Sequence, residues 1–151
     1  MLDETDKKLL NLLQKDASIT HKQLAAELNL TVTPVYERIK KLKKSGVIKR
    51  ITAEIDRNKV NKPVMVFCEV SLSSHTLENL KKFEKEVLGL QEVLESYHVS
   101  GEYDYMLKVL IAGMEEYREF LINKLAKLKN VGHVNSTFVM KPLREERFLQ
   151  L

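Results

Sequence analysis

Seven lysine and arginine residues and a single acid lie between Tyr36 and Arg50, a density of positive charge that could neutralise phosphate groups. Basic side chains contact the backbone of a nucleic acid and position a protein on it, while other polar side chains on an exposed helix face can reach base edges in the major groove. A solvated amphipathic helix would carry similar charges. The segment follows a short helix and leads into a basic stretch, and this arrangement favours a helix-turn-helix that binds DNA.

The side chains expected to face a duplex lie opposite an apolar stripe formed by Val35, Ile39 and Leu42. Base or groove contacts are predicted for the residues with hydroxyl or carboxylate groups at the start of the helix, namely Thr31, Thr33, Tyr36 and Glu37. Phosphate contacts are predicted for the basic residues Arg38, Lys40, Lys41, Lys44 and Arg50. Arg38 has an alternative role, which is to tie this helix to its neighbours.

The elements that position these residues are three helices in the first third of the chain. Asp3 can cap a first helix that ends near Asp16, and Thr20 with Gln23 has the spacing of a capping box at the start of a second. Thr31 or Thr33 caps the third helix, which ends at Ser45-Gly46; Pro34 is tolerated in its first turn, where an amide hydrogen would have no partner. The β-branched segment 47–55 predicts a strand or small wing, and the polar segment 56–63 a linker.

The remaining chain alternates between strand and helix patterns. Strands are expected over 64–72, 93–100, 103–111 and 131–140, with helices over 76–87 and about 114–128, and a tight turn at Gly101-Glu102. In the first strand Val64, Val66, Cys68 and Val70 share one face. The order β-α-β-β-α-β is that of a ferredoxin-like unit. Its two helices cover one sheet face, and a second subunit is the simplest cover for the other.

Charge is divided unevenly along the 151 residues, whose net charge is +4. Residues 1–50 hold 11 Lys and Arg against 6 Asp and Glu, whereas the remainder holds 14 against 15. The excess therefore lies in the helical third, which agrees with nucleic-acid binding. The acidic, polar N-terminus is unlike a secretory signal, and no apolar stretch is long enough to span a membrane. We expect a cytoplasmic protein.

Few residues suggest other chemistry. The only cysteine, Cys68, lies in an apolar run and is expected to be a core residue. His21, His75, His98 and His133 are scattered, with no metal-site spacing, and the glycines form no phosphate-binding signature. No catalytic residue, metal or cofactor is predicted.

Three segments resemble the Lrp/AsnC family of transcriptional regulators. They are Leu2 to Ala17 (LDETDKKLLNLLQKDA), Val35 to Ile48 (VYERIKKLKKSGVI) and Val99 to Val109 (VSGEYDYMLKV). Their order and spacing fit from Leu2 to about Pro142, essentially the full chain. The resemblance implies an α+β protein with a winged helix-turn-helix over residues 1–50, a hinge strand and linker over 51–63, and a ferredoxin-like domain of the RAM type over 64–151. It also implies homodimers that pair through their sheets and assemble further, often to octamers.

The resemblance further implies a site for an amino acid or related metabolite at the contact between dimers. One part would be the turn residues Ser100, Gly101, Tyr103 and Asp104, and the other Asn135, Ser136 and Thr137 on the last strand. The carboxylate of Asp104 could bind the ammonium group of an amino acid, and N–H groups near Gly101 with the hydroxyl of Thr137 could bind its carboxylate. The alternative is that Gly101 only forms the hairpin turn and Asp104 pairs with a lysine.

The leading hypothesis is therefore a sequence-specific DNA-binding regulator, and not an enzyme, whose partners are double-stranded DNA, further copies of itself and an amino-acid effector. Two alternatives stay open. Tetrapyrrole decarboxylases share this overall fold, although they have no need of a basic recognition helix. An architectural DNA-binding protein would differ only in its insensitivity to metabolites.

Overall fold

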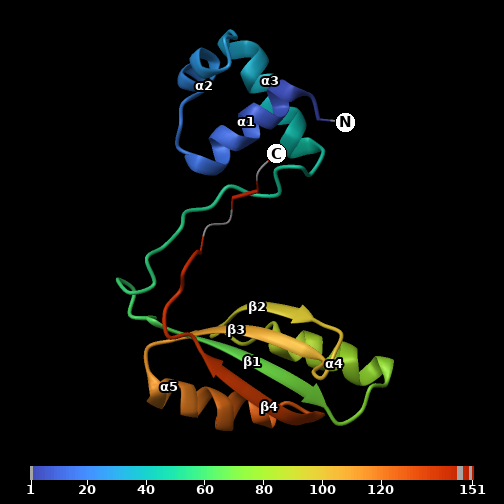
Figure 1. The fold of residues 1–151 in the computed structure, drawn as a ribbon. Coiled ribbons are helices and arrows are strands. Elements are labelled where there is room, and N and C mark those ends of the chain that lie inside the picture. Colours follow the sequence, from blue (N-terminus) through green and yellow to red (C-terminus); the bar gives the residue numbers. More distant parts are fainter. Residues whose placement is uncertain (1, 146–147, 150) are drawn as a thin grey trace. The chain divides into compact units, whose positions relative to one another are not determined.

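The computed structural model describes residues 2–145, 148–149 and 151. They cluster into two compact units, one formed by Met1–Glu54 with Arg144–Leu151 and the other by Ile55–Leu143. The first unit contains three helices and the second a four-stranded sheet with helices on it (Figure 1). The predicted α+β class is confirmed, with three helices preceding a ferredoxin-like sheet.

The helical unit consists of α1 (Glu4–Lys15), α2 (His21–Glu27) and α3 (Val32–Lys44). The first two helices begin at complete capping boxes, Asp3 with Asp6 and Thr20 with Gln23, and the second of these was predicted. α3 begins after Thr31, which adopts an extended backbone but makes no side-chain cap hydrogen bond. The core of the unit is formed by buried side chains from all three helices: Leu9, Leu10, Leu24, Ala25, Val35, Ile39 and Leu42.

The predicted strand over 47–55 is absent: within the described part of the chain, these residues pair with no other strand. The segment is rich in β-branched residues, and two of them, Ile51 and Ile55, are 52% and 64% exposed. A strand is held by hydrogen bonds to a neighbour as well as by side-chain preference. With no neighbour available in one chain, the preference alone does not form a ladder.

The second unit has a sheet in the order β2-β3-β1-β4, all neighbours being antiparallel. The strands are β1 (Val64–Leu72), β2 (Val93–His98), β3 (Tyr105–Ile111) and β4 (Val131–Phe138). The helices are α4 (Leu77–Val87) and α5 (Met114–Glu119), the latter continuing as η1 (Phe120–Lys124) and η2 (Leu125–Lys127). The helix expected over about 114–128 is thus present but changes its winding along its length.

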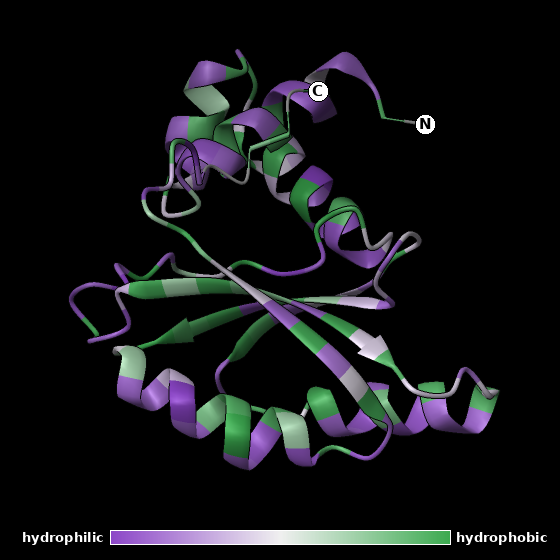
Figure 2. Cartoon of the chain, turned by 60° about the horizontal axis from the view of Figure 1, so that its bottom comes forward, coloured by the Kyte–Doolittle hydropathy of each residue, from purple (hydrophilic) through white to green (hydrophobic). Residues whose placement is uncertain are grey.

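Both helices lie on the same face of the sheet (Figure 2), and apolar residues of both pack against the strands in one core. Val66, Cys68 and Val70 of β1 are fully buried beneath them, as the alternation of residue types predicted. Phe83 of α4 and Phe120 of η1 are fully buried in the same core. The other face of the sheet is not covered by any helix of this unit, and its residues along β1 and β3 are partly exposed except for Met65, which is 5% exposed.

Candidate nucleic-acid interface and ligand site

α3 presents a polar face to solvent because its apolar residues are spaced to face the core. Val35, Ile39 and Leu42 are 0%, 7% and 3% exposed, and they recur at the i, i+4 and i+7 spacing of one helix face. Pro34 is accommodated in the first turn, where its missing N–H leaves no helical hydrogen bond unmade. Of the nine residues predicted to contact DNA, all but Arg38 are exposed: Thr31, Thr33, Tyr36, Glu37, Lys40, Lys41, Lys44 and Arg50.

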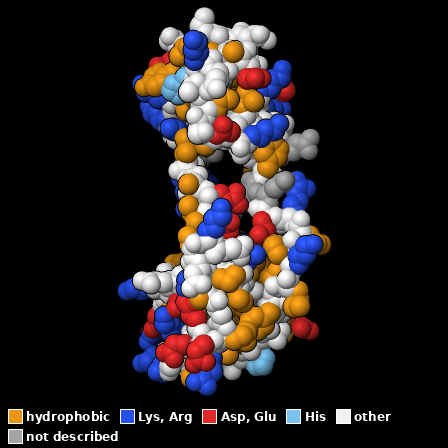
Figure 3. Space-filling model, turned by 90° about the vertical axis from the view of Figure 1, so that its left-hand side faces the viewer, with side chains coloured by type: hydrophobic (Ala, Val, Ile, Leu, Met, Phe, Trp, Pro, Cys, Tyr) orange, Lys and Arg blue, Asp and Glu red, His pale blue; other side chains and the backbone are white. Residues whose placement is uncertain are grey.

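The lysines of the last two turns of α3 carry charge that is free to meet an anion. Among the residues that the structure describes, no acid forms an ion pair with Lys40, Lys41 or Lys44. Lysines near the end of a helix also interact favourably with the helix dipole, which is a structural reason for their presence. Lys and Arg side chains are prominent on the surface of the helical unit, in the upper part of Figure 3.

Arg38 differs from the other predicted phosphate contacts because its guanidinium is already engaged. It donates to Asp3 and to Asp6, with N–O distances of 2.6 Å in both cases. The Asp6 side chain is only 6% exposed. The hydrogen bond from the Asp6 N–H, followed by that from Arg38, lowers the pKa of Asp3. This geometry agrees with the alternative role considered for Arg38, which is to tie α3 to another helix. A phosphate contact would require Arg38 to break its bonds to Asp3 and Asp6.

The aromatic ring of Tyr36 lies beside His21 at the start of α2, with 5.7 Å between ring centroids in an edge-on arrangement. Tyr36 nevertheless stays 48% exposed. Two adjacent apolar residues at the turn and the start of α3, Leu30 and Val32, are 36% and 45% exposed. The first turns of α3 therefore offer hydroxyl and apolar groups, and the later turns offer positive charge.

The predicted ligand loop joins β2 to β3 and is longer than expected, because β3 begins at Tyr105 rather than at Tyr103. Gly101 adopts φ +138°, a conformation that side chains rarely permit. The loop is closed by the Val99 N–H, which donates to the Asp104 carbonyl over 2.9 Å. The Asp104 N–H in turn donates to the carbonyl of Val70 on β1. Asp104 is thus fixed against the end of β1.

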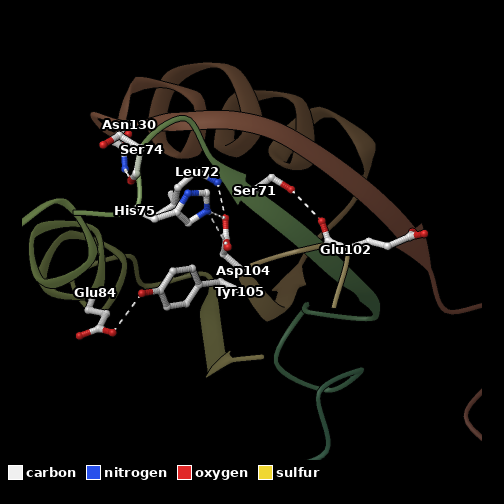
Figure 4. Close-up of polar contacts among 9 residues, drawn as sticks. All are labelled: Ser71, Leu72, Ser74, His75, Glu84, Glu102, Asp104, Tyr105 and Asn130. Atoms are coloured by element: carbon white, nitrogen blue, oxygen red, sulfur yellow. Dashed lines mark hydrogen bonds and ion pairs between the residues drawn. The ribbon is translucent and has the colours of Figure 1, made fainter. Parts of the chain in front are cut away.

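The carboxylate of Asp104 has hydrogen-bond partners from β1 and from the loop before α4 (Figure 4). It accepts a hydrogen bond of 2.7 Å from the Leu72 N–H, and His75 Nε2 lies 2.9 and 3.0 Å from its two oxygens. The Leu72 N–H, followed by His75, lowers the pKa of Asp104. The alternative considered was a lysine partner; among the residues that the structure describes, the charged partner of Asp104 is His75 and not a lysine. Asp104 is therefore held as an anion, with 22% of its side chain exposed.

His75 was not among the predicted site residues. It precedes α4 on a loop that is held by two asparagine side chains, one from α4 and one from the turn before β4. Asn130 Nδ2 donates to the Ser74 carbonyl over 2.6 Å, and Asn79 Nδ2 donates to the Ser74 hydroxyl over 3.0 Å. Because His75 and Asp104 are 29 residues apart, no local spacing signal could have joined them.

The three predicted residues on β4 do not face the same way. Asn135 lies opposite Glu69 in the register with β1 and donates to its carboxylate over 2.8 Å. Ser136 points to the helix-covered face, where it contacts the hydroxyl of Tyr117. Side chains alternate along a strand, so Thr137 shares the uncovered face with Asn135. Of the three residues predicted to bind an effector, Ser136 therefore lies on the opposite face of the sheet from Asn135 and Thr137.

Within one chain the two parts of the predicted ligand site are not joined. Across the described ranges, no hydrogen bond or ion pair connects the 100–104 loop to Asn135, Ser136 or Thr137. Next to the loop, a shallow hollow of about 250 Å³ lies between α4 and the β2–β3 edge. Its wall includes Tyr105, whose hydroxyl donates to Glu84 over 3.0 Å and whose ring stacks on His98 at 4.7 Å. Burial, with Glu84, raises the pKa of Tyr105 to about 12.

Metal binding and membrane spanning find no support in the described residues. In residues 2–145, 148–149 and 151, no group of three or more His, Cys, Asp or Glu side chains could hold a metal ion. The same residues contain no helix that is both long enough and apolar enough to cross a membrane.

Comparison with known proteins gives matches to both units. The family model of the Lrp/AsnC ligand binding domain matches residues 65–149, and a winged helix-turn-helix DNA-binding model matches residues 2–49. The leucine-responsive regulatory protein of Haemophilus influenzae is 34% identical over 150 residues, which are 99% of this chain and 90% of that protein.

Two crystal structures resemble the whole chain. An AsnC family transcriptional regulator from Agrobacterium tumefaciens has a TM-score of 0.93 and 36% identity, covering 98% of this chain and 96% of that chain. A transcriptional regulator from Neisseria meningitidis in complex with L-Met has a TM-score of 0.95 and 28% identity, covering 99% and 96%.

Proposed function

Because this chain belongs to the Lrp/AsnC family of DNA-binding transcriptional regulators, we propose that it binds operator DNA by placing α3 in the major groove. The observation that carries the proposal is the outward face of α3, whose exposed hydroxyl, carboxylate and lysine groups lie opposite a fully packed apolar stripe. Residues 1–50 act as the DNA-binding domain, 51–63 as the hinge, and 64–151 as the domain for assembly and effector binding. Because its proposed target is chromosomal DNA, we place the protein in the cytoplasm.

Different parts of α3 contact different parts of the DNA. Thr31, Thr33, Tyr36 and Glu37, at the end that enters the groove, contact bases. Lys40, Lys41 and Lys44, with Arg50 beyond the helix, contact phosphates, which fix the position of the protein without specifying sequence. Arg38 is a positioning residue, because its bonds to Asp3 and Asp6 hold α3 on the helical unit.

A mobility-shift titration with genomic fragments tests DNA binding. Affinity should fall steeply as salt rises, because bound cations are released from the duplex. Replacing Lys40 or Lys41 by Ala should weaken binding on all fragments and reduce the salt slope by about one unit per lost contact. Lys81→Ala on α4, an equal loss of charge in the other unit, is the control. No retention of any fragment at low salt would refute the proposal.

The effector is a free amino acid or a related metabolite. The match to the ligand binding domain and the L-Met complex of the Neisseria regulator support this assignment. The Asp104 carboxylate binds the ammonium group, and the N–H groups of the turn at Ser100 and Gly101, beside Tyr103, bind the carboxylate. Asn135 and Thr137 of a neighbouring subunit complete the site. Ser136 supports this strand from the covered side and makes no direct contact.

A thermal-shift panel of the common amino acids, including L-methionine, tests this site. A ligand at one hundred times its Kd stabilises the folded state by about 2.7 kcal/mol. The shift should disappear in Asp104→Ala and persist in Glu102→Gln, which removes a charge from the same loop. A shift that is unchanged in Asp104→Ala would exclude the site, and a panel without any shift would favour an effector-independent architectural protein.

Homodimers pair through the uncovered sheet face and assemble further, to octamers. Phe67, Met106 and Leu110 on this face are only partly buried, and Tyr97 is 50% exposed. Phe67→Glu should convert the assembly to smaller species in size-exclusion chromatography with light scattering. Leu77→Glu places the same charge at an exposed position of α4 and should leave the assembly intact. A monomeric wild-type protein would contradict this arrangement.

A further inference from the structure

Glu37 occupies the centre of the outward face of α3. It lies two residues after Val35 and two before Ile39, both of which are buried, so its side chain projects away from the core. Thr33, one turn earlier, lies on the same line. These two side chains are therefore the first to meet a base edge if α3 enters a groove by its N-terminal end.

The charge of Glu37 is anomalous in this position. It is the only acid between Thr31 and Arg50, a stretch that holds seven basic residues. Lys41 follows at the i+4 spacing that favours an ion pair. Even so, among the residues that the structure describes, none forms a hydrogen bond or an ion pair with the Glu37 side chain. Neither ion pairing nor helix capping accounts for it.

The side chains that recognise purines are missing from the same part of the helix. Guanine is read by Arg or Lys and adenine by Asn or Gln, and none of these four types occurs from Thr31 to Glu37. The single guanidinium of α3 belongs to Arg38, which is bonded to Asp3 and Asp6. The first two turns therefore offer one charged group to the bases, and it is a hydrogen-bond acceptor.

A carboxylate that enters a groove loses water and approaches phosphates, both of which are unfavourable unless a donor replaces the water. In the major groove that donor is the N4 amino group of cytosine. The adenine amino group is a poorer partner, because the N7 acceptor beside it repels a carboxylate. We propose that Glu37 is a specificity-determining residue that accepts a hydrogen bond from a cytosine amino group in each half-site; this inference rests on the proposed DNA-binding function.

Selection from a random duplex library tests the inference with the full-length protein. Wild-type protein should enrich one cytosine per half-site. Glu37→Gln should enrich adenine at that same position, because a carboxamide can both donate to N7 and accept from N6. On paired duplexes that differ only there, wild type should prefer cytosine and the variant adenine, each by about tenfold.

The control is Glu27→Gln on α2, which removes the same charge from an exposed position of the helical unit. It should bind all duplexes more tightly and keep the cytosine preference. If Glu37→Gln behaves like Glu27→Gln, with a uniform gain and an unchanged motif, Glu37 does not read a base and the inference fails. If wild-type protein enriches no motif at all, sequence-specific DNA binding itself fails.

Discussion

Arg38 on α3 and Asp6 on α1 are joined by a hydrogen bond of 2.6 Å, although 32 residues separate them in the sequence. The same guanidinium bonds to Asp3, which caps α1 and forms a capping box with Asp6. The residue that begins the first helix and the one that orients the third are therefore parts of one network. This network holds α3 in place and with it the face that we propose to contact bases.

Arg38→Ala should destabilise the helical unit. It leaves the carboxylate of Asp6, whose side chain is 6% exposed, without its cationic donor, and an unsatisfied buried acceptor costs about 1 to 3 kcal/mol. Urea unfolding followed by circular dichroism measures the loss. Lys40→Ala removes an equal charge from an exposed position and should have little effect on stability. Equal stability of the two variants would show that the Arg38 network contributes nothing.

Gly46→Ala should destabilise the end of α3 although there is room for the added methyl group. Gly46 adopts φ +75°, and no atom lies within 4 Å of the position that a Cβ would occupy. The left-handed conformation is unfavourable for alanine by about 1 kcal/mol. Gly46→Asn should recover most of the loss, because asparagine tolerates this region, as Asn29 does in the same unit with φ 53°. Thermal unfolding of the wild type and the two variants checks this order of stability. A Gly46→Ala variant as stable as the wild type would contradict the prediction.

Local patterns predicted most of the elements in this chain. The Thr20 and Gln23 spacing located the start of α2, and the alternation through Val66, Cys68 and Val70 gave the buried face of β1. Both depend on residues a few positions apart. The Arg38–Asp6 and His75–Asp104 contacts depend on packing between distant segments, which sequence spacing does not specify. The prediction of a strand near Ile51 was wrong for a related reason, because a strand needs a neighbouring strand as well as suitable residues.

Tyr117→Phe should reduce the loss of folding stability that the protein shows as the pH rises above 10. Burial raises the pKa of Tyr117 from 10.0 to about 12. The fold therefore favours the neutral phenol, and this contribution is complete below pH 10 and is lost as the pH rises from 10 toward 12. Chemical unfolding at several pH values should show wild type losing stability faster than the variant in that interval. Tyr36→Phe, at an exposed position, should follow wild type; a parallel decline of Tyr117→Phe would refute the argument.

Asp104→Asn should lower stability at neutral pH and lose that effect in acid. The Leu72 N–H and then His75 lower the pKa of Asp104 from its usual 3.8. A depressed pKa means that the folded state favours the carboxylate, so the contribution is present above pH 3.8 and disappears as the pH falls through the lower folded-state value. The difference in melting temperature between wild type and variant should therefore narrow below about pH 4. Glu102→Gln, whose side chain is exposed in the same loop, should differ little from wild type throughout. A difference for Asp104→Asn that stays constant down to about pH 2 would mean that its bonds to Leu72 and His75 do not favour the charged form, and the proposed ammonium-binding role would lose its electrostatic basis.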